Sequence, residues 1–363
     1  MGAYGGVLSG LAVLIIFYLI VLQTPEQKKA ELDELRIIEQ EALSQLRGAA
    51  AMSSGKAHAG IPGLVRNDLS CAEAKLKVAR KEWSDPNLGR IYARETETYP
   101  HFRISLHEKE YDVVRWRIME EGKYYEDEVH QRFVDILDHQ PSSYVLDVGA
   151  NIGYYTLLSA SLGHNVIAFE PNPSNVLRLC DSLRLNDWSN GVPDIHIFQN
   201  AVADVHGEEM MLHAPKNPGM AYLKPLEGQD EETNDHTART TLISLDKLAE
   251  EQGWFQRTDF KIKLFKIDVE GKEPQVVLGA PKLLKSGIIE HVLTEGRRFG
   301  RTNVQDSFAV LFEAGYTIKE PAVPVKGNTP KDKAKSVCDW WLDKLGPNSQ
   351  MVRDMWWVRA DTM

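Results

Sequence analysis

Residues 143–156, Ser-Tyr-Val-Leu-Asp-Val-Gly-Ala-Asn-Ile-Gly-Tyr-Tyr-Thr, are the stretch that decides the fold of this chain. The apolar run 144–148 predicts a buried strand, and the segment from about Tyr154 to Leu162 predicts a helix after the turn. A second apolar run, 165–169, ends in Phe-Glu-Pro and so puts Glu170 at the carboxyl end of its strand. Strand, turn, helix and strand in this order are typical of the nucleoside-binding half of an α/β sheet.

The turn between the first strand and its helix contains three residues suited to unusual backbone geometry. Gly149 lets the backbone lie close against a ligand, Asn151 tolerates a left-handed conformation, and Gly153 admits close packing of helix on strand. We therefore expect a bound molecule to approach this turn.

Two classes of nucleoside ligand use this geometry. A dinucleotide site has the pattern G-x-G-x-x-G, which seats the pyrophosphate on the helix N-terminus. Here the pattern offers only Gly149 and Gly153, and Asp147 precedes them. A carboxylate in that place would repel a pyrophosphate but suits the ammonium and sulfonium groups of S-adenosylmethionine. Glu170 can accept hydrogen bonds from ribose hydroxyls in either class. S-adenosylmethionine is therefore favoured, with a nicotinamide dinucleotide or a turn without ligand as the alternatives.

The composition is that of an ordinary globular protein except at the N-terminus. Of 363 residues, 43% are apolar and 26% are charged. Residues 5–22 contain no charged side chain, and eighteen such residues are just enough to span a bilayer. A cleaved signal peptide would have a basic start and a shorter apolar core, and a buried core helix would need partners that the polar residues after Pro25 do not offer. We expect residues 1–25 to be an uncleaved single-pass membrane anchor.

The anchor is followed by a predicted stem, residues 26–63. Residues 26–47 predict a charged helix with a narrow apolar stripe, which either associates weakly with itself or is solvated, and residues 48–63 predict a flexible linker. An extension (64–140) and a core domain (141–363) then follow. The basic residues after the anchor favour a cytosolic domain. Against that, the order of anchor, stem and enzyme is common in the lumen of the endoplasmic reticulum or Golgi, which by analogy is the expected location.

Polar residues stand at the ends of the predicted strands along one edge of the sheet. The strands are 144–148, 165–169, 195–198, 262–267 and 288–293. The polar or small residues at or just beyond their ends are Asp147, Glu170, Asn200 with Ala201, Asp268 with Glu270, and Glu295. A doubly wound sheet places the third of these positions near an adenine.

Three other segments complete the expected organisation. A single helix is predicted over 273–285, and 355–359 is the expected closing strand. Residues 214–238 predict a long polar loop without periodicity, either a lid over the ligand or a solvated insertion.

The chain resembles the FkbM family of S-adenosylmethionine-dependent methyltransferases in Val145–Thr156, Phe169–Pro173, Asn200-Ala201 and Lys266–Glu273. The segment Gly122-Lys-Tyr-Tyr-Glu126 resembles the family's Gly-x-aromatic-Glu segment with one extra residue. The resemblance covers roughly residues 110–320 and implies a Rossmann-like class I fold, with a mostly parallel seven-stranded sheet, helices on both faces and an antiparallel last strand. It also implies transfer of a methyl group to a hydroxyl of a sugar or another small metabolite.

Methyl transfer to a hydroxyl requires that the oxygen be aligned and its proton removed. Asp268, which matches the family's strand-end acid, is predicted to orient the acceptor or take its proton. Glu270 is predicted on the same side by strand periodicity, although it could instead cap the N–H groups of the next helix. Glu295 is the third candidate. A divalent cation held by Asp268 and Glu295 is conceivable, but a site without metal is favoured.

Charge limits the possible partners. A net charge of -10 without a basic stripe disfavours nucleic acid, so a sugar, glycan or small-molecule acceptor is expected. Two rival functions remain, an NAD-dependent oxidoreductase and a membrane-tethered interaction module with an inactive methyltransferase fold.

The cysteines show no metal-binding pattern. Cys71, Cys180 and Cys338 lack metal-ligand spacing, and their odd number excludes complete pairing. Cys180 is expected to face the core from its helix.

Overall fold

The computed structural model describes part of residues 63–363, one of two units into which the chain divides. The described residues are 71, 92–97, 99–107, 118, 126–137, 143–188, 193–214, 221–226, 237–295, 303–344 and 354–362. The expected anchor (1–25) and stem (26–63) lie outside them. Within these described ranges, no helix has the length and apolar character needed to cross a bilayer.

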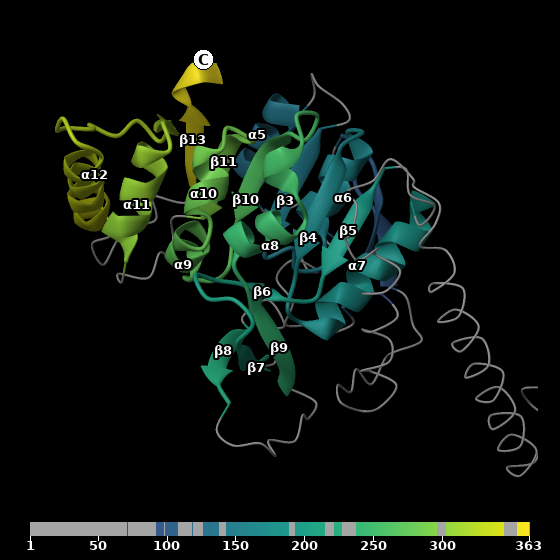
Figure 1. The fold of residues 1–363 in the computed structure, drawn as a ribbon. Coiled ribbons are helices and arrows are strands. Elements are labelled where there is room, and N and C mark those ends of the chain that lie inside the picture. The colour runs from purple at the N-terminus through teal and green to yellow at the C-terminus, as the bar shows by residue number, and fades with distance from the viewer. Residues whose placement is uncertain are drawn as a thin grey trace, which may run out of the picture. The chain divides into compact units, whose positions relative to one another are not determined.

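A seven-stranded mixed sheet forms the centre of the domain (Figure 1), in the order β12-β13-β11-β10-β3-β4-β5. Its strands are β3 (Tyr144–Val148), β4 (Asn165–Phe169), β5 (Ile195–Phe198), β10 (Ile262–Ile267), β11 (Ile289–Glu295), β12 (Tyr316–Glu320) and β13 (Asp354–Arg359). The pairs from β11 to β5 are parallel, and β13 runs antiparallel to both β11 and β12. The predicted sheet with an antiparallel last strand is confirmed, and so is the doubly wound topology.

Helices cover both faces of this sheet (Figure 1). One group is α5 (Asp127–Leu137), α6 (Tyr154–Ser161) and α7 (Pro173–Leu185). The other group is α8 (Leu245–Glu251), α9 (Glu273–Leu278), α10 (Pro281–Lys285) and α11 (Val304–Glu313). The helix α12 (Pro330–Lys344) packs against α11. Because side chains alternate along a strand, each buried strand contributes residues to both apolar layers. Val145, Leu264 and Leu293 belong to the layer under the first group.

Smaller elements extend the domain. The pair β1 (Tyr92–Glu95) and β2 (Arg103–Leu106) is antiparallel, and two 3-10 turns lie at Trp254–Gln256 and Ala360–Thr362. A second sheet has the order β6-β9-β7-β8. Its strands are β6 (Ala201–Val202), β7 (Glu209–His213), β8 (Tyr222–Pro225) and β9 (Thr237–Ile243). The prediction of a structureless loop over 214–238 is therefore wrong where β8 and the start of β9 lie.

The single helix predicted over 273–285 is also wrong, because α9 and α10 are separate helices. Gly279 lies against the neighbouring chain, where an added Cβ would come within 2.1 Å of the Ala203 carbonyl oxygen. Pro281 then occupies the first turn of α10, where its missing N–H is tolerated. Close backbone contact and a proline thus divide an apolar pattern that reads as continuous.

A disulfide joins Cys71 to Cys180 of α7, 109 residues further along the chain. Cys180 is buried in the core, as expected, but its pairing was not predicted. Cys338 is free and only partly buried.

Candidate active site

Charged side chains from four neighbouring strands lie on the same face of the sheet. They are Asp147 of β3, Lys266 of β10 with Asp268 just beyond it, Glu295 of β11 and Asp354 of β13. In the sheet register Lys266 is opposite Asp147, and Glu295 is opposite Asp354. Residues two positions away along each strand belong to the apolar layer under α5–α7, namely Val145, Leu264, Leu293 and Trp356. The strand period of two therefore brings these charges together at the carboxyl edge of the sheet, under α5 and α6.

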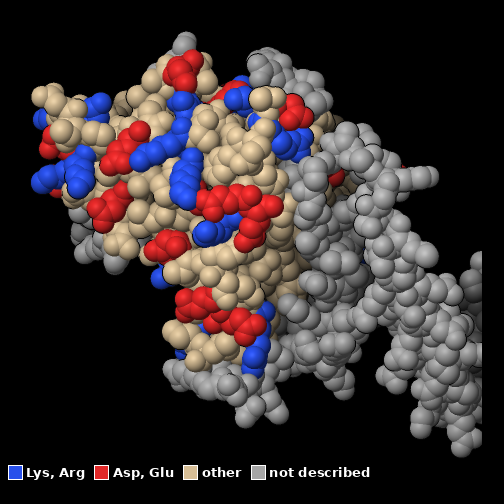
Figure 2. Space-filling view, in the orientation of Figure 1, with Lys and Arg blue, Asp and Glu red and all other residues tan. Residues whose placement is uncertain are grey.

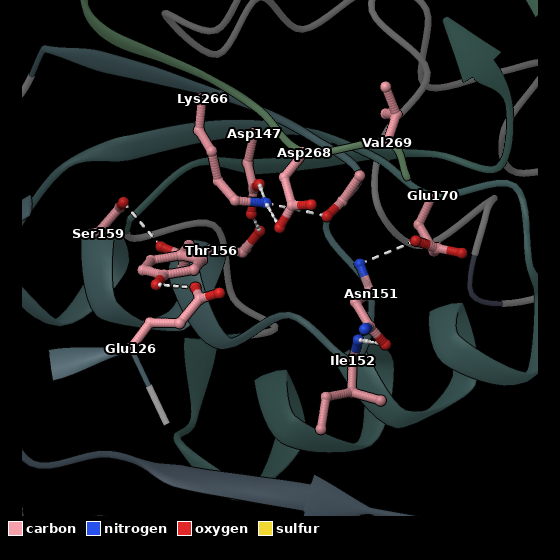
Figure 3. A network of polar contacts seen from close by, with 12 residues as sticks. Glu126, Asp147, Asn151, Ile152, Thr156, Ser159, Glu170, Lys266, Asp268 and Val269 are labelled. Atoms are coloured by element: carbon pink, nitrogen blue, oxygen red, sulfur yellow. Dashed lines mark hydrogen bonds and ion pairs between the residues drawn. The ribbon is translucent and has the colours of Figure 1, made fainter. Parts of the chain in front are cut away.

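Lys266 links the acids of two strands (Figure 3). Its Nζ lies 3.3 Å from Asp147 Oδ1 and 3.4 Å from Asp268 Oδ2, and it donates a hydrogen bond to the Gly149 carbonyl at 3.0 Å. Thr156 of α6 donates to the other oxygen of Asp147 at 2.7 Å. Burial by itself lowers the pKa of Lys266, but Asp147 and Asp268 more than offset this, so its pKa is raised and it stays charged.

The negative charge of Asp147 is thereby balanced within the protein by Lys266. Its side chain is 0% exposed, whereas that of Asp268 is 30% exposed. The contact predicted between Asp147 and the amine of the cofactor stays a prediction. Asp147 has a second role in the structure, because its ion pair holds Lys266 beside Asp268.

Glu170 closes the loop after β4. Its Oε2 accepts a hydrogen bond from the Asn151 N–H at 2.8 Å, and its Oε1 accepts from the Asn172 N–H at 2.9 Å and the Asn175 amide at 3.3 Å. Burial raises the pKa of Glu170 to about 7 despite these donors. A carboxylate oxygen has two lone-pair positions, so Oε2 has one left for a further donor such as a ribose hydroxyl. The residue thus fits the predicted nucleoside contact while already shaping the turn (Figure 3).

The turn has the expected left-handed residues, with φ of 80° at Gly149, 53° at Asn151 and 93° at Gly153. The reasons differ from those predicted. A Cβ on Gly149 would lie 1.8 Å from the Asp268 carbonyl oxygen, so its close neighbour is the loop after β10. A Cβ on Gly153 would meet Leu179 at 2.3 Å, so the close packing is between α6 and α7 and not between helix and strand.

Three carboxylates meet beside the exposed end of β10. Asp268, Glu273 and Glu295 each place one oxygen within 4.8 Å of the others. Burial, with Asp268 and Glu273 nearby, raises the pKa of Glu295 well above its usual range. Burial also raises the pKa of Asp354 to about 7, with Glu126 and Asp268 adding to the effect. The site therefore concentrates acids in a place that disfavours their full ionisation.

Glu126 belongs to the same neighbourhood. It stands just before α5 and accepts a hydrogen bond from the Tyr155 hydroxyl at 2.8 Å (Figure 3). It also contributes to the electrostatics of Lys266, Glu295 and Asp354. Glu126 therefore belongs to the site despite the extra residue in the segment 122–126.

The periodicity argument for Glu270 is wrong. β10 ends at Ile267, and Glu270 lies in a turn with φ of 56°, exposed to solvent. The backbone bonding considered for it is made by Glu273, whose Oε1 accepts from the N–H groups of Val269 and Gly271 at 2.9 and 3.1 Å. Asp268 and Glu295 are brought together, and Glu270 is not part of the three-carboxylate cluster.

Asn200 and Ala201 lie at the junction of the two sheets. The Asn200 amide donates to the Thr241 carbonyl of β9 at 3.1 Å, and Ala201 is buried in β6. Their predicted contact with the adenine stays a prediction.

Sequence reasoning missed Lys266, Glu273 and Asp354 as members of the site. The available signal was a lysine inside an otherwise buried parallel strand, since an unpaired charge there would be very costly. Glu273 and Asp354 gave no comparable signal, because an acid at a helix start or a strand end is ordinary.

Together these observations define the class of protein. A doubly wound sheet carries a glycine turn at its first strand, an acid at the end of the second, and a cluster of acids at the end of the fourth. That is an α/β enzyme built around a nucleoside cofactor.

Comparison with known proteins makes the class specific. Residues 147–318 match the family model described as the methyltransferase FkbM domain. The predicted resemblance to this family is therefore confirmed over these residues. S-adenosylmethionine is the cofactor that goes with it, and the free acceptor position on Glu170 fits that cofactor.

Solved structures similar to this chain are also methyltransferases. The FkbM methyltransferase from Methylobacillus flagellatus KT has 16% identity and a TM-score of 0.35, covering 60% of this chain and 43% of that chain. A precorrin-6y C5,15-methyltransferase from Geobacter metallireducens GS-15 has 11% identity and a TM-score of 0.32, covering 64% of this chain and 88% of that chain. A SAM-dependent methyltransferase from Agrobacterium tumefaciens has 9% identity and a TM-score of 0.32, covering 61% of this chain and 58% of that chain. The chain thus spans less than half of the first of these proteins. No curated protein matches it.

Proposed function

We propose that this chain is an S-adenosylmethionine-dependent O-methyltransferase that acts on a hydroxyl of a sugar, a glycan or another small molecule. The supporting observation is Asp268, a partly exposed carboxylate at the end of β10 that lies against the cofactor turn through its carbonyl group. The acceptor hydroxyl would lie beside this carboxylate.

When bound, S-adenosylmethionine supplies a methyl group that is already strongly electrophilic. The protein has to align the acceptor oxygen and receive its proton. Asp268 would accept that proton as the oxygen forms its bond to the methyl carbon and the carbon–sulfur bond breaks, with the electron pair of that bond left on the sulfur. Lys266 Nζ lies 3.4 Å from Asp268 Oδ2, and this ion pair would hold the carboxyl group in place beside the acceptor.

The surface supports a neutral or small acceptor in preference to nucleic acid. On the face shown in Figure 2, Lys and Arg side chains are interspersed with Asp and Glu, and the whole chain has a net charge of -10. A protein that grips a phosphate backbone instead presents a concentrated basic surface.

The disulfide bears on the location. Disulfides persist in oxidising compartments and are rare in the cytosol. The Cys71–Cys180 bond therefore supports a catalytic domain that faces the lumen of the secretory pathway, held by the proposed anchor at residues 5–22. This argument goes against the cytosolic orientation favoured by the basic residues after the anchor.

Alkaline carbonate extraction tests the anchor, since release of the full-length protein would exclude a spanning segment. Protease treatment of sealed vesicles tests the side. Protection of the domain supports the lumen, and digestion supports the cytosol.

The activity is tested by incubating the full-length protein with S-adenosylmethionine labelled in its methyl group and with fractionated glycans, lipids and small metabolites from the source cells. We expect label on an oxygen of one fraction, and loss of labelling in Asp268→Asn. An interaction module with an inactive site would bind the cofactor without labelling any fraction, and an NAD-dependent oxidoreductase would not bind it.

A further inference from the structure

Asp268, Glu273 and Glu295 converge from β10, α9 and β11 on one small region, with one oxygen of each within 4.8 Å of the others. Oxygens that surround one Ca²⁺ or Mg²⁺ are about 2.0–2.6 Å from the ion, so opposite ligands are about 4–5 Å apart. The spacing therefore allows the three oxygens to share one ion. Acid clusters without an ion are common, so this spacing alone assigns nothing.

Glu273 supplies a second observation. The residue is 0% exposed, and its Oε1 is fixed by the N–H groups of Val269 and Gly271. Its Oε2 is removed from solvent and has no hydrogen-bond partner. A buried carboxylate oxygen in this state is costly unless a cation or donor compensates it. Oε2 of Glu295 is buried and lacks a hydrogen-bond partner as well.

Two basic side chains form ion pairs near the cluster, but neither pairs with Glu273 or Glu295. Lys266 pairs with Asp147 and Asp268, and Arg132 pairs with Glu320 at 2.8 Å and with Asp354 at 3.8 Å. Among the ion pairs of the described residues, none includes Glu273 or Glu295. The buried Glu273 and the partly buried Glu295 thus stand beside Asp268 without an ion-pair partner among the described residues.

We propose that Asp268, Glu273 and Glu295 bind one hard divalent cation, Mg²⁺ or Mn²⁺, at the carboxyl edge of the sheet. Ligands that are all carboxylate oxygens suit these ions in preference to Zn²⁺ or copper. The expectation of a metal-free site is thereby replaced.

The chemical role of the ion rests on the proposed function. An acceptor with two adjacent hydroxyls, as sugars have, would complete the coordination with its oxygens. A bound cation makes a hydroxyl more acidic. Asp268 would bind the ion through one oxygen and receive the hydroxyl proton on the other. The substrate class is therefore narrowed to acceptors with neighbouring oxygen donors.

Mn²⁺ serves as the probe because electron paramagnetic resonance counts its free form directly. The full-length protein in detergent is stripped of metal and titrated with Mn²⁺. We expect one ion per chain, and binding at least tenfold weaker in Glu295→Gln and in Glu273→Gln. Glu290→Gln is the matched control, because Glu290 lies on the same strand but pairs with Lys263. It should bind Mn²⁺ like the unmodified chain.

Thermal unfolding of each variant shows whether it is folded, and Glu295→Gln keeps the test valid if Glu273→Gln does not fold. Absence of bound Mn²⁺ at millimolar concentration, or equal affinity in Glu295→Gln, would overturn the proposal. Calorimetry with S-adenosylmethionine separates the two claims. Cofactor binding without Mn²⁺ binding leaves the proposed function standing and removes the cation site. Mn²⁺ binding without cofactor binding leaves the cation site standing and removes the proposed function.

Discussion

Lys266 and Asp147 face each other across β10 and β3, with Nζ 3.3 Å from Oδ1 and both side chains almost completely buried. The pair connects the cofactor turn to the acceptor side, since the same ammonium group reaches Asp268 and the Gly149 carbonyl. A change at Lys266 should therefore affect both stability and chemistry.

Replacing Lys266 by Met should lower the free energy of unfolding by about 3–5 kcal/mol, because Asp147 would be left as a buried, unpaired charge. Changing both residues, Lys266→Met with Asp147→Leu, should cost clearly less than the sum of the single changes, because no charge is then stranded. Urea unfolding of the four proteins measures this. Additive losses would show that the two residues do not act as a pair.

Gly149→Ala should be much more destabilising than Gly315→Ala. Both glycines have a left-handed φ, 80° and 86°, so both changes carry a strain of about 1 kcal/mol. Only at Gly149 does the added Cβ meet another atom, the Asp268 carbonyl oxygen at 1.8 Å, whereas nothing lies within 4 Å at Gly315. Melting temperatures of both variants measure the difference. Equal shifts would mean that the loop after β10 does not lie against the turn.

Cys71→Ser should lower the free energy of unfolding by about 2–5 kcal/mol, as expected for opening a loop of this length. Cys338→Ser is the control, since Cys338 is free, and it should change little. A peptide map without reductant should show Cys71 linked to Cys180. Finding both thiols free in protein isolated from its own compartment would remove the argument for the lumen.

Cofactor affinity should depend on pH through Glu170, whose pKa is raised to about 7 by burial. Protonation below that pH removes an acceptor for the ribose, so S-adenosylmethionine should bind roughly five- to tenfold more weakly at pH 6 than at pH 8. The effect of pH on folding stability through Glu170 has the opposite sign. The folded chain binds this proton more tightly than the unfolded chain does, so the group's contribution to stability falls as pH rises from about 4.5 to 7. Glu170→Gln should abolish the pH dependence of binding over this range.

Six strands of the main sheet could be predicted from sequence because they are short, apolar and separated by glycine, proline or polar residues. The edge strand β12 was not predicted, since Tyr316–Glu320 mixes polar with apolar residues. β8 and β9 were not predicted, since Tyr222–Pro225 is mostly exposed and Thr237–Ile243 directly follows the polar, acidic residues 230–236. Their strand structure comes from pairing with β7, a contact that local composition does not encode.

The positions of two candidate site residues, Glu170 and Asp268, were predictable because each acid directly follows an apolar strand. The site was not predictable where the meaning of a residue depends on distant neighbours. Glu273 looks like an ordinary first-turn acid, and only the folded chain brings it to Glu295. The Cys71–Cys180 bond is a contact of the same kind, since its partners are 109 residues apart.

The central claim is that Glu170 holds the cofactor while Asp268 acts on the acceptor. Calorimetric titration of S-adenosylmethionine into the unmodified full-length chain, Glu170→Gln and Asp268→Asn tests it most directly. We expect a Kd of about micromolar order for the unmodified chain, at least tenfold weaker binding in Glu170→Gln, and affinity within a few fold of the original in Asp268→Asn. Binding of NAD but not of S-adenosylmethionine by the unmodified chain would contradict the account.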